Sequence, residues 1–241
     1  MTILEELLES INQDAPVRSV MIGAHWTAVC SRYCGLASTL MDDCPHASTR
    51  VRDVGRLHQK NARELAEFAR SDNLLEASLG VAAINSLLPP PDGDIVEINA
   101  FDILAEKGKG RNVALVGHFP FIPRLRPLVG QLWVIEQNPT AEEYPKNAAA
   151  ELIPQADVVA ITGTSLINHT LEGLLGLCRP DGFIMLLGPS TPLSPILFRH
   201  GVTILSGSQV VDESAVFRTI SQGAHFQQVE GVRLVSITRE E

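Results

Sequence analysis

The chain has 241 residues, 45% of them hydrophobic, which suits one large domain or two small ones with an ordinary core. It carries 28 acidic and 19 basic residues, a formal net charge of −9, and such a surface repels the phosphate backbone of nucleic acids. No apolar run approaches the roughly 20 residues of a membrane span, and the acidic amphipathic start, MTILEELLESINQ, lacks the features of a signal peptide. We therefore expect a soluble cytoplasmic protein that binds neither nucleic acid nor membranes.

The four cysteines, Cys30, Cys34, Cys44 and Cys178, are too few for a disulfide framework in a chain of this length. Zinc sites generally show tight C-x-x-C pairs, and these spacings contain none. A transition metal bound by these cysteines and the nearby His46 is the alternative that this spacing disfavours. We expect reduced thiols that hold no structural zinc.

Before about residue 105, the order of the predicted elements is typical of an α+β domain. A helix is predicted over residues 3–11, followed by a β-hairpin made of VRSVMIGAHWTAVCS and YCGLASTLM. Two helical stretches follow, HQKNARELAEFARS and NLLEASLGVAAINSLL, and the prolines at 89–91 end the second. NAFDILAEKGKGR predicts a short helix capped by Asn99 and stopped near Gly108, which we interpret as a hinge between domains at 1–105 and 106–241.

After this hinge, strand and helix patterns alternate. The predicted strands are NVALVGHF, QLWVIEQ, ADVVAITG, GFIMLLGPS and GVTILSGS, short apolar runs that suit a parallel sheet covered by helices on both faces. The predicted helices between and after them are AAAELIP, LINHTLEGLLGLC, LSPILFRH and ESAVFRTISQG. This pattern predicts a Rossmann-like, doubly wound α/β domain.

Ligands of such sheets bind beyond the carboxyl ends of the strands, so the segment after each strand, here called its tip, is a candidate for binding. The first tip, GHFPFIP, keeps Gly117 but places Phe119 and Pro120 where a dinucleotide site needs further glycines, which argues against ordinary NAD binding. Glu136 ends the second strand about 20 residues later, where an acid often accepts ribose hydroxyls. A solvated acid at a strand end is an equally good interpretation.

The third tip, TGTSLINHT, gathers the most polar side chains. Gly163 permits a tight turn, and Thr164 or Ser165 can cap a helix that begins near Leu166. The free N–H groups of that helix start attract anions. Asn168 and His169 fall in its first predicted turn, so we expect the cluster to bind an anionic or strongly polar group.

The remaining candidates have weaker patterns. His25 and Thr27 are predicted on one face of a strand and Trp26 on the other. Asp212 is expected mainly to cap a helix N-terminus, and a contact with the ligand is its secondary interpretation. The fourth tip, GPSTPLSP, combines a stiff turn with hydroxyl and N–H groups; its candidates are Gly188, Pro189, Ser190 and Thr191.

Six segments, in chain order, resemble the bacterial and archaeal heavy-metal chelation family: GAHWTAV, ASLGVAAINSLL, NVALVGHFPFIPRL, VIEQNP, ITGTSLINHTLEGLL and GPSTPLSPILFRHGVTILSG. The similarity covers nearly the whole chain, and the last two segments are the most specific. The resemblance implies an enolase-N-terminal-like domain joined to a Rossmann-like domain, with a ligand cleft between them to which GAHWTAV and Asn85 contribute. It also implies a role in condensing or hydrolysing pterin-, flavin- or siderophore-like molecules that chelate metals.

Three functions stay open from the sequence. The first is an enzyme on a heterocyclic metabolite, in which His118, His169 or Glu136 moves protons. The second is a non-catalytic carrier of a metal–chelate complex, and the third is an S-adenosylmethionine-dependent methyltransferase with Glu136 on the ribose. The expected cofactor is a transition metal held through a chelating small molecule, and a homodimer is the default expectation.

Overall fold

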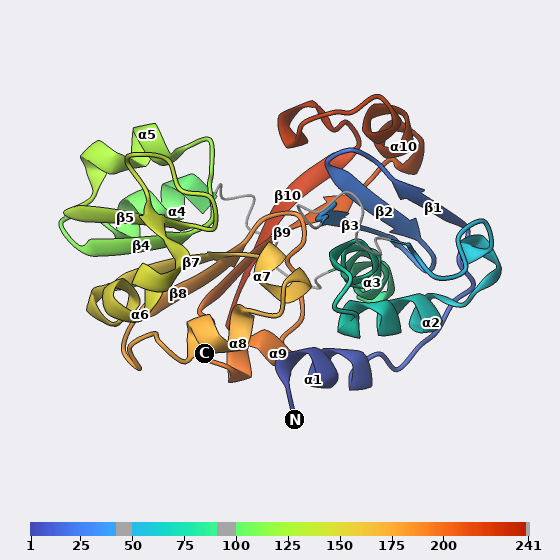
Figure 1. Cartoon of the computed structure of the whole chain (residues 1–241), viewed down its shortest axis with the longest axis horizontal. Helices are drawn as coiled ribbons and strands as arrows, with labels where there is room; N and C mark the ends of the chain where they lie inside the picture. Colours follow the sequence, from blue (N-terminus) through green and yellow to red (C-terminus); the bar gives the residue numbers. More distant parts are fainter. Residues whose placement is uncertain (42–49, 91–99, 240–241) are drawn as a thin grey trace.

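The structure, a computed structural model, describes residues 1–41, 50–90 and 100–239 (Figure 1). The N-terminal elements lie on one side of the molecule, and a long sheet extends away from them. Cys44, His46, Pro91 and the expected helix cap Asn99 lie outside the described residues. The domain boundary expected near residue 105 falls on the helix α4, Ala100–Lys107, and stays a prediction.

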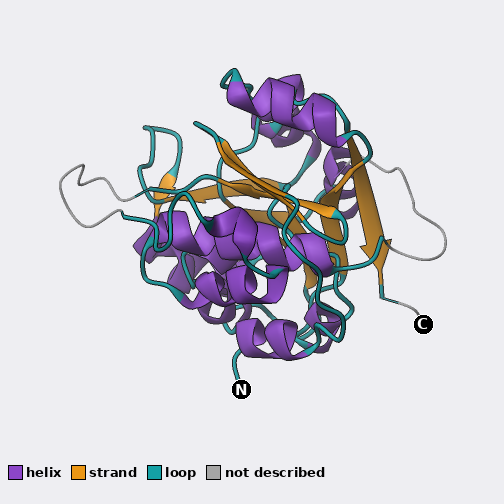
Figure 2. Cartoon of the chain, turned by 90° about the vertical axis from the view of Figure 1, so that its right-hand side faces the viewer, coloured by secondary structure: helices purple, strands orange, loops and turns teal. Residues whose placement is uncertain are grey.

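The N-terminal part contains a small antiparallel sheet in the order β1-β2-β3, formed by Ser19–Ile22, Trp26–Cys30 and Cys34–Ser38. The expected hairpin is therefore a three-stranded meander. Figure 2, which faces this part of the molecule, shows helices on both sides of its strands. α3 packs on β2 and β3, and α10 packs on β1 and β2.

The helices of this part begin where the sequence offers a cap. α1, Ile3–Glu9, starts with a capping box in which Thr2 and Glu5 bond each other's backbone N–H. α3, Leu74–Leu87, starts at Asn73, whose side chain accepts from two backbone N–H groups. The single helix expected over residues 58–71 is instead three short turns: η1 (Leu57–Gln59), α2 (Ala62–Ala66) and η2 (Glu67–Arg70).

The large sheet has the strand order β10-β9-β8-β7-β4-β5-β6. All neighbours pair in parallel except β10, which is antiparallel to β9. Without β10 this is the doubly wound order 3-2-1-4-5-6, so the predicted α/β class, a Rossmann-like sheet beside a small α+β part, is confirmed. The strands are β4 (Asn112–Val116), β5 (Gln131–Glu136), β6 (Tyr144–Pro145), β7 (Val158–Thr162), β8 (Phe183–Leu187), β9 (Ile204–Val210) and β10 (Val232–Thr238). The sequence predicted five of them and missed β6 and β10.

The helices between these strands are short, partly because prolines interrupt them. They are α5 (Ile122–Leu125), η3 (Arg126–Leu128), η4 (Lys146–Ala148), α6 (Ala149–Leu152), η5 (Ile153–Gln155), α7 (Thr164–Ile167), α8 (Leu171–Leu175), α9 (Ile196–Arg199), α10 (Glu213–Ser221) and η6 (Phe226–Gln228). The long helix expected over residues 166–178 is split into α7 and α8. The break falls at His169, whose φ of 58° is left-handed and cannot continue a helix.

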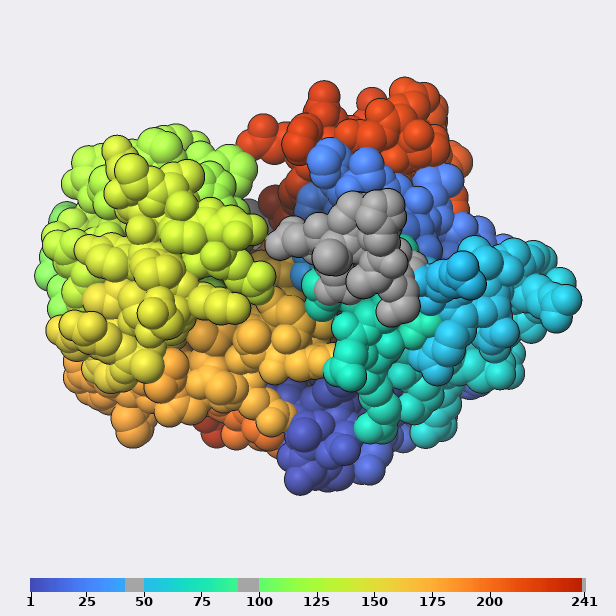
Figure 3. Space-filling view, in the orientation of Figure 1, coloured from blue at the N-terminus to red at the C-terminus, as the bar shows by residue number. Residues whose placement is uncertain are grey.

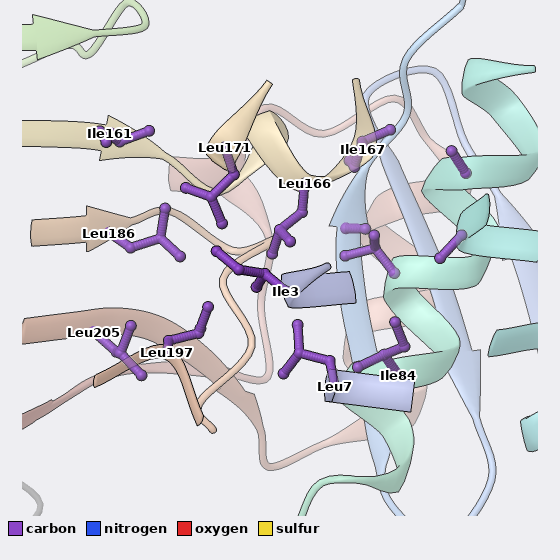
Figure 4. Close-up of a cluster of buried hydrophobic side chains, with 14 of the residues drawn as sticks. Ile3, Leu7, Ile84, Ile161, Leu166, Ile167, Leu171, Leu186, Leu197 and Leu205 are labelled. Carbon is purple, nitrogen blue, oxygen red and sulfur yellow. The ribbon is translucent and has the colours of Figure 1, made fainter. Parts of the chain in front are cut away.

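Two hydrophobic cores lie on the two faces of the large sheet. The first, here called the shared core, joins α1 and α3 to the sheet through α7, α8 and α9 (Figure 4). Its drawn members include Ile3, Leu7, Ile84, Ile161, Leu166, Leu186, Leu197 and Leu205. The second, here called the outer core, lies under α4 and α5 and contains Phe101, Leu104, Leu115, Leu125 and Val134.

Candidate functional site

A cavity of about 1240 Å³ opens at the carboxyl ends of the parallel strands. Figure 3 shows the hollow between the green and yellow atoms of the β4–β5 side and the red and blue atoms opposite. Its floor is made by the ends of β4, β5, β7 and β8 and by Ser206 and Gly207 in the middle of β9. Its far side is made by residues of β10, by Trp26 and Ser38 of the small sheet, and by the segment 225–227. Twelve of its lining residues were expected from the strand tips: Gly117, His118, Phe119, Pro120, Glu136, Gly163, Thr164, Ser165, Asn168, Gly188, Pro189 and Ser190.

The tip of β4 begins with a glycine that the geometry requires. Gly117 has a φ of 112°, and a Cβ there would lie 2.9 Å from Cβ of Thr162. The chain then places His118, Phe119 and Pro120 on the cavity wall. The rings of Phe119 and Phe121 are nearly parallel, at 10° and 5.3 Å between centroids, so this wall is aromatic rather than a glycine-rich phosphate cradle.

His118 is held by a carboxylate that sequence reasoning missed. Its Nδ1 lies 2.6 Å from Oε1 of Glu143, and the other oxygen of Glu143 accepts the Thr140 backbone N–H. The His118 side chain is 62% exposed, whereas that of Glu143 is only 6% exposed. The Thr140 amide and His118, in that order, lower the pKa of the Glu143 carboxyl, so it is ionised at neutral pH. An ionised carboxylate on Nδ1 leaves Nε2 of His118 as the free ring nitrogen.

Glu136 lies at the end of β5 and lines the same cavity. It is half-buried, and one of its oxygens accepts the backbone N–H of Gln137 at 2.9 Å. Arg124 and Lys146 also line the cavity, and the Arg124 guanidinium lies over the Phe101 ring, 4.3 Å from its centroid. Two cations and one half-buried acid therefore surround the aromatic wall.

The polar cluster after β7 differs in detail from the expectation. Gly163 is the N-cap, α7 is a single turn, and Asn168 ends that turn instead of starting it. The hydroxyls mostly bond within the cluster: Thr162 to Thr164 at 3.0 Å, and Ser165 to the Thr162 carbonyl at 2.7 Å. Neither Thr164 nor Ser165 caps α7, and no side-chain hydrogen bond caps its start at Gly163. The expected binding of an anionic or strongly polar group at this cluster stays a prediction.

Asn168 keeps one free polar group. Its Oδ1 accepts from Oγ1 of Thr170 at 2.7 Å and, more weakly, from the Thr170 backbone N–H. Its amide nitrogen makes no hydrogen bond to the described part of the chain. Asn168 therefore offers a donor at the cavity while its acceptor orders the segment between α7 and α8.

The tip of β8 joins the two parts of the chain. Ser190 is buried, and its Oγ accepts the Ser38 backbone N–H at 2.8 Å. Asn85 of α3 donates its amide to the carbonyls of Leu36 and Ser190. Asn85 and Thr191 do not line the cavity. Asn85 joins the two parts through its bond to Ser190, whereas Oγ1 of Thr191 is buried without a hydrogen-bond partner in the described part of the chain. Pro189 and Gly188 do line it.

The other candidates lie in different places. Trp26 lines the cavity beside Phe226, while His25 precedes β2, is exposed, and stacks on His225 at 4.4 Å. Thr27 is buried and bonds Thr39, so it does not share an open face with His25.

His169 and Asp212 also lie away from the cavity. His169 borders a separate groove of about 280 Å³ near the N-terminus, and its Nε2 bonds the carbonyl of Ala69 at 2.8 Å. Asp212 is exposed and caps α10 through the Ala215 N–H. A proton-transfer role at the cavity is therefore not available to His169.

The expectation of reduced thiols is corrected by a disulfide between Cys30 and Cys34. These residues face each other across the turn between β2 and β3. Cys178 is free and half-buried, and burial raises its pKa to about 11, which makes it a poor nucleophile at neutral pH.

Family models match both parts of the chain. The model described as “Putative heavy-metal chelation” (DUF364) matches residues 99–239, and a second model with the same description (DUF4213) matches residues 4–88. The chain belongs to this family. The resemblance inferred from the six sequence segments is thereby confirmed. None of the described helices is long and apolar enough to cross a membrane.

Solved members of the family have the same fold. A DUF364-family protein of unknown function from Desulfitobacterium hafniense is 29% identical, with a TM-score of 0.84 over 98% of this chain and 97% of that one. A second, from Pyrococcus horikoshii, is 20% identical, with a TM-score of 0.83 over 98% of each chain. An uncharacterized protein of Methanocaldococcus jannaschii is 26% identical over 196 residues, 74% of this chain and 70% of that protein.

Proposed function

We propose that this member of the heavy-metal chelation family binds a pterin-, flavin- or siderophore-like metabolite in the cavity, and that His118 moves the proton when this metabolite is condensed or hydrolysed. The observation that carries the proposal is the bond between His118 Nδ1 and the nearly buried Glu143 carboxylate, with the histidine ring on the cavity wall. A carboxylate on one ring nitrogen fixes the tautomer and stabilises the imidazolium that forms when the other nitrogen takes a proton.

The composition of the wall supports a flat, polar ligand. Phe119, Phe121, Trp26 and Phe226 offer aromatic surface, on which heterocycles stack. Arg124 and Lys146 offer positive charge to the ionised oxygens by which chelators hold metals. The cavity, at about 1240 Å³, exceeds the ~300–1,000 Å³ of ordinary small-molecule sites, so a ligand with its metal fits.

A ligand screen by thermal shift tests the binding part of the proposal. Pterins, flavins, catechol and hydroxamate siderophores with and without Fe³⁺, and S-adenosylmethionine form the panel. A ligand present at 100 times its dissociation constant stabilises the chain by about 2.7 kcal/mol, an easily measured shift. A hit for S-adenosylmethionine alone would replace the proposal with the methyltransferase alternative.

The catalytic part is tested on the ligand found by the screen. His118→Ala should lower turnover by about 10²–10⁴-fold with little change in ligand affinity, the usual loss for a general acid or base. Glu143→Gln should lower turnover less, because His118 stays but loses its orienting charge. His58→Ala, an exposed histidine in η1 that does not line the cavity, is the matched control and should leave turnover unchanged. If the unsubstituted chain binds the ligand and returns it unaltered, the protein is a carrier and the role of His118 is wrong.

A further inference from the structure

The closed end of the β2–β3 hairpin carries a group of potential metal ligands outside the cavity. The register pairs Cys30 with Cys34 at this end and Trp26 with Ser38 at the other, and Trp26 and Ser38 line the cavity. The two sulfurs and a carboxylate oxygen of Glu213 all lie within 4.8 Å of one another. Nothing in the proposed function uses these three side chains.

Glu213 reaches the cysteines because of the way the C-terminal part packs. It is the first residue of α10, and α10 covers the small sheet through Val216 and Ile220, which contact Ala28 and Leu36. Cys30 is fully buried and Cys34 is 9% exposed, whereas the Glu213 side chain is 41% exposed. The carboxylate therefore forms the solvent side of the group and the sulfurs its buried side.

We propose that Cys30, Cys34 and Glu213 bind one thiophilic divalent cation, such as Zn²⁺ or Cd²⁺, once the disulfide is reduced. A dithiol reductant gives two electrons and two protons to the S–S bond, becomes a disulfide itself, and leaves two protein thiols. The cation then displaces both thiol protons and is bound by two thiolates and the carboxylate, with water as the fourth ligand of a tetrahedral site. The oxidised pair has no thiolate and does not bind.

The local chemistry favours a soft cation over a free dithiolate. Two thiolates at so buried a position are costly without a counter-charge, and a divalent cation supplies it. Thiolate ligands select soft metals such as zinc, whereas an all-oxygen set would select calcium or magnesium. Arg18 now donates to both oxygens of Glu213, but each carboxylate oxygen can accept more than one bond, so Glu213 can keep Arg18 and bind the cation. The spacing of the cysteines argued against zinc, but the third ligand, Glu213, comes from a distant part of the chain that cysteine spacing does not reveal.

Cadmium titration tests the site. The full chain with Cys44→Ser and Cys178→Ser keeps only the two thiols in question. It is reduced with dithiothreitol, freed of reductant by anaerobic gel filtration, and titrated with Cd²⁺ while thiolate-to-metal charge transfer is followed in the ultraviolet. We expect one Cd²⁺ per chain with this absorption in the reduced protein, and neither in the oxidised protein.

Two single substitutions separate a carboxylate ligand from an ion pair. Glu213→Gln and Arg18→Gln break the same salt bridge, but only Glu213→Gln removes the ligand. Glu213→Gln should weaken Cd²⁺ binding by at least about tenfold, since loss of even an outer-shell partner costs that much, while Arg18→Gln should keep or raise the affinity. Equal affinities for these two variants overturn the three-ligand site, and so does a reduced chain without charge-transfer absorption. Cys34→Ser leaves one thiolate, so it should weaken Cd²⁺ binding and lower the absorption; if that variant does not fold, the oxidised and reduced forms of the parent chain decide the question. The result is independent of the cavity, so it neither supports nor weakens the proposed function.

Discussion

The two faces of the large sheet are packed in different ways. On one face, α1 and α3 of the N-terminal part pack against α7, α8 and α9, so residues from both parts of the chain form the shared core. On the other face, α4 and α5 cover an outer core drawn from residues 101–204 alone. One wall of the cavity is built by both parts of the chain, and the opposite wall belongs to the C-terminal part alone. We infer that changes in the shared core affect the whole molecule, whereas changes under α5 stay local.

A pair of leucine- and isoleucine-to-alanine changes tests this directly. Ile84 in the shared core is 1% exposed and Leu125 in the outer core is 0% exposed, so each change to alanine should cost about 2–5 kcal/mol of unfolding free energy. Hydrogen exchange should separate them. Ile84→Ala should speed exchange in both α3 and β7, and Leu125→Ala chiefly in α5 and β4. Unchanged protection of β7 in Ile84→Ala would show that the two parts unfold independently.

The tightest packing of the shared core predicts an unfavourable glycine-to-alanine change inside a helix. Alanine at Gly80 would gain about 1 kcal/mol of helix propensity. A Cβ there collides with the backbone of Phe68 and Ala69 in η2, however, and overpacking of this kind typically costs about 1–3 kcal/mol or more. We expect a net loss in chemical unfolding. Gly173→Ala in α8 is the control: a Cβ there meets open space, so that change should be neutral or stabilising. A more stable Gly80→Ala variant would mean that η2 moves to make room for the new Cβ and that α3 is not tightly packed against η2 at Gly80.

On the other wall, the pair of His118 and Glu143 predicts a pH effect. The pKa of Glu143 is lowered in the folded chain, first by the Thr140 amide and then by His118. Its stabilising contribution is therefore complete above the unfolded pKa of a glutamate, about 4.3, and is lost as the pH falls through the lower folded value. Below this pH, the unfolding free energy of Glu143→Gln should fall less steeply with decreasing pH than that of the unsubstituted chain. The adjacent exposed Glu142→Gln removes the same charge and should keep the normal slope. Equal slopes for all three chains would mean that Glu143 is not held as described.

What the sequence predicts well in this chain is local. The apolar runs of β4, β5, β7, β8 and β9 are periodic signals within a few residues, and the polar tips after them follow from the parallel order. β10 was missed because only its middle is buried: Arg233 and Leu234 are exposed and Val235 and Ser236 are buried, which gives neither an apolar run nor a strict alternation. The break between α7 and α8 is not predicted because Asn168 and His169 are tolerated in a helix. The left-handed φ of His169 accompanies a contact with Ala69, a residue far away in the sequence.

What the sequence does not predict in this chain depends on distant partners. Glu143 becomes a candidate site residue only through its hydrogen bond to His118, 25 residues earlier in the chain. The segment around it, QNPTAEE, contains only a proline and two acids after a strand, which is too weak a pattern to predict this pair. Cys30 and Cys34 gain a third neighbour in Glu213 only because α10 folds back over the small sheet. The family resemblance predicts Asn85 at the ligand, and the hydroxyl after β8 predicts Thr191 there. In the fold neither residue lines the cavity, and Asn85 bonds carbonyls of both parts.

Substitutions of Asn168, which lines the cavity at the end of α7, should have the smallest effect on stability. They also give the most direct test of ligand binding in the cavity. Its Oδ1 accepts from Thr170, so Asn168→Ala should cost no more than about 0.5–1.5 kcal/mol of stability, the net value of a typical hydrogen bond. Asn168→Asp keeps that acceptor and should leave stability nearly unchanged. Both variants lose the amide donor that has no partner in the described chain, so both should weaken ligand binding by about 1–3 kcal/mol, the cost of leaving a polar ligand atom unpaired. Chemical unfolding and titration with the ligand found in the screen measure the two effects separately. If Asn168→Asp binds as tightly as the unsubstituted chain, the amide does not touch the ligand, and Asn168 serves only to order the segment between α7 and α8.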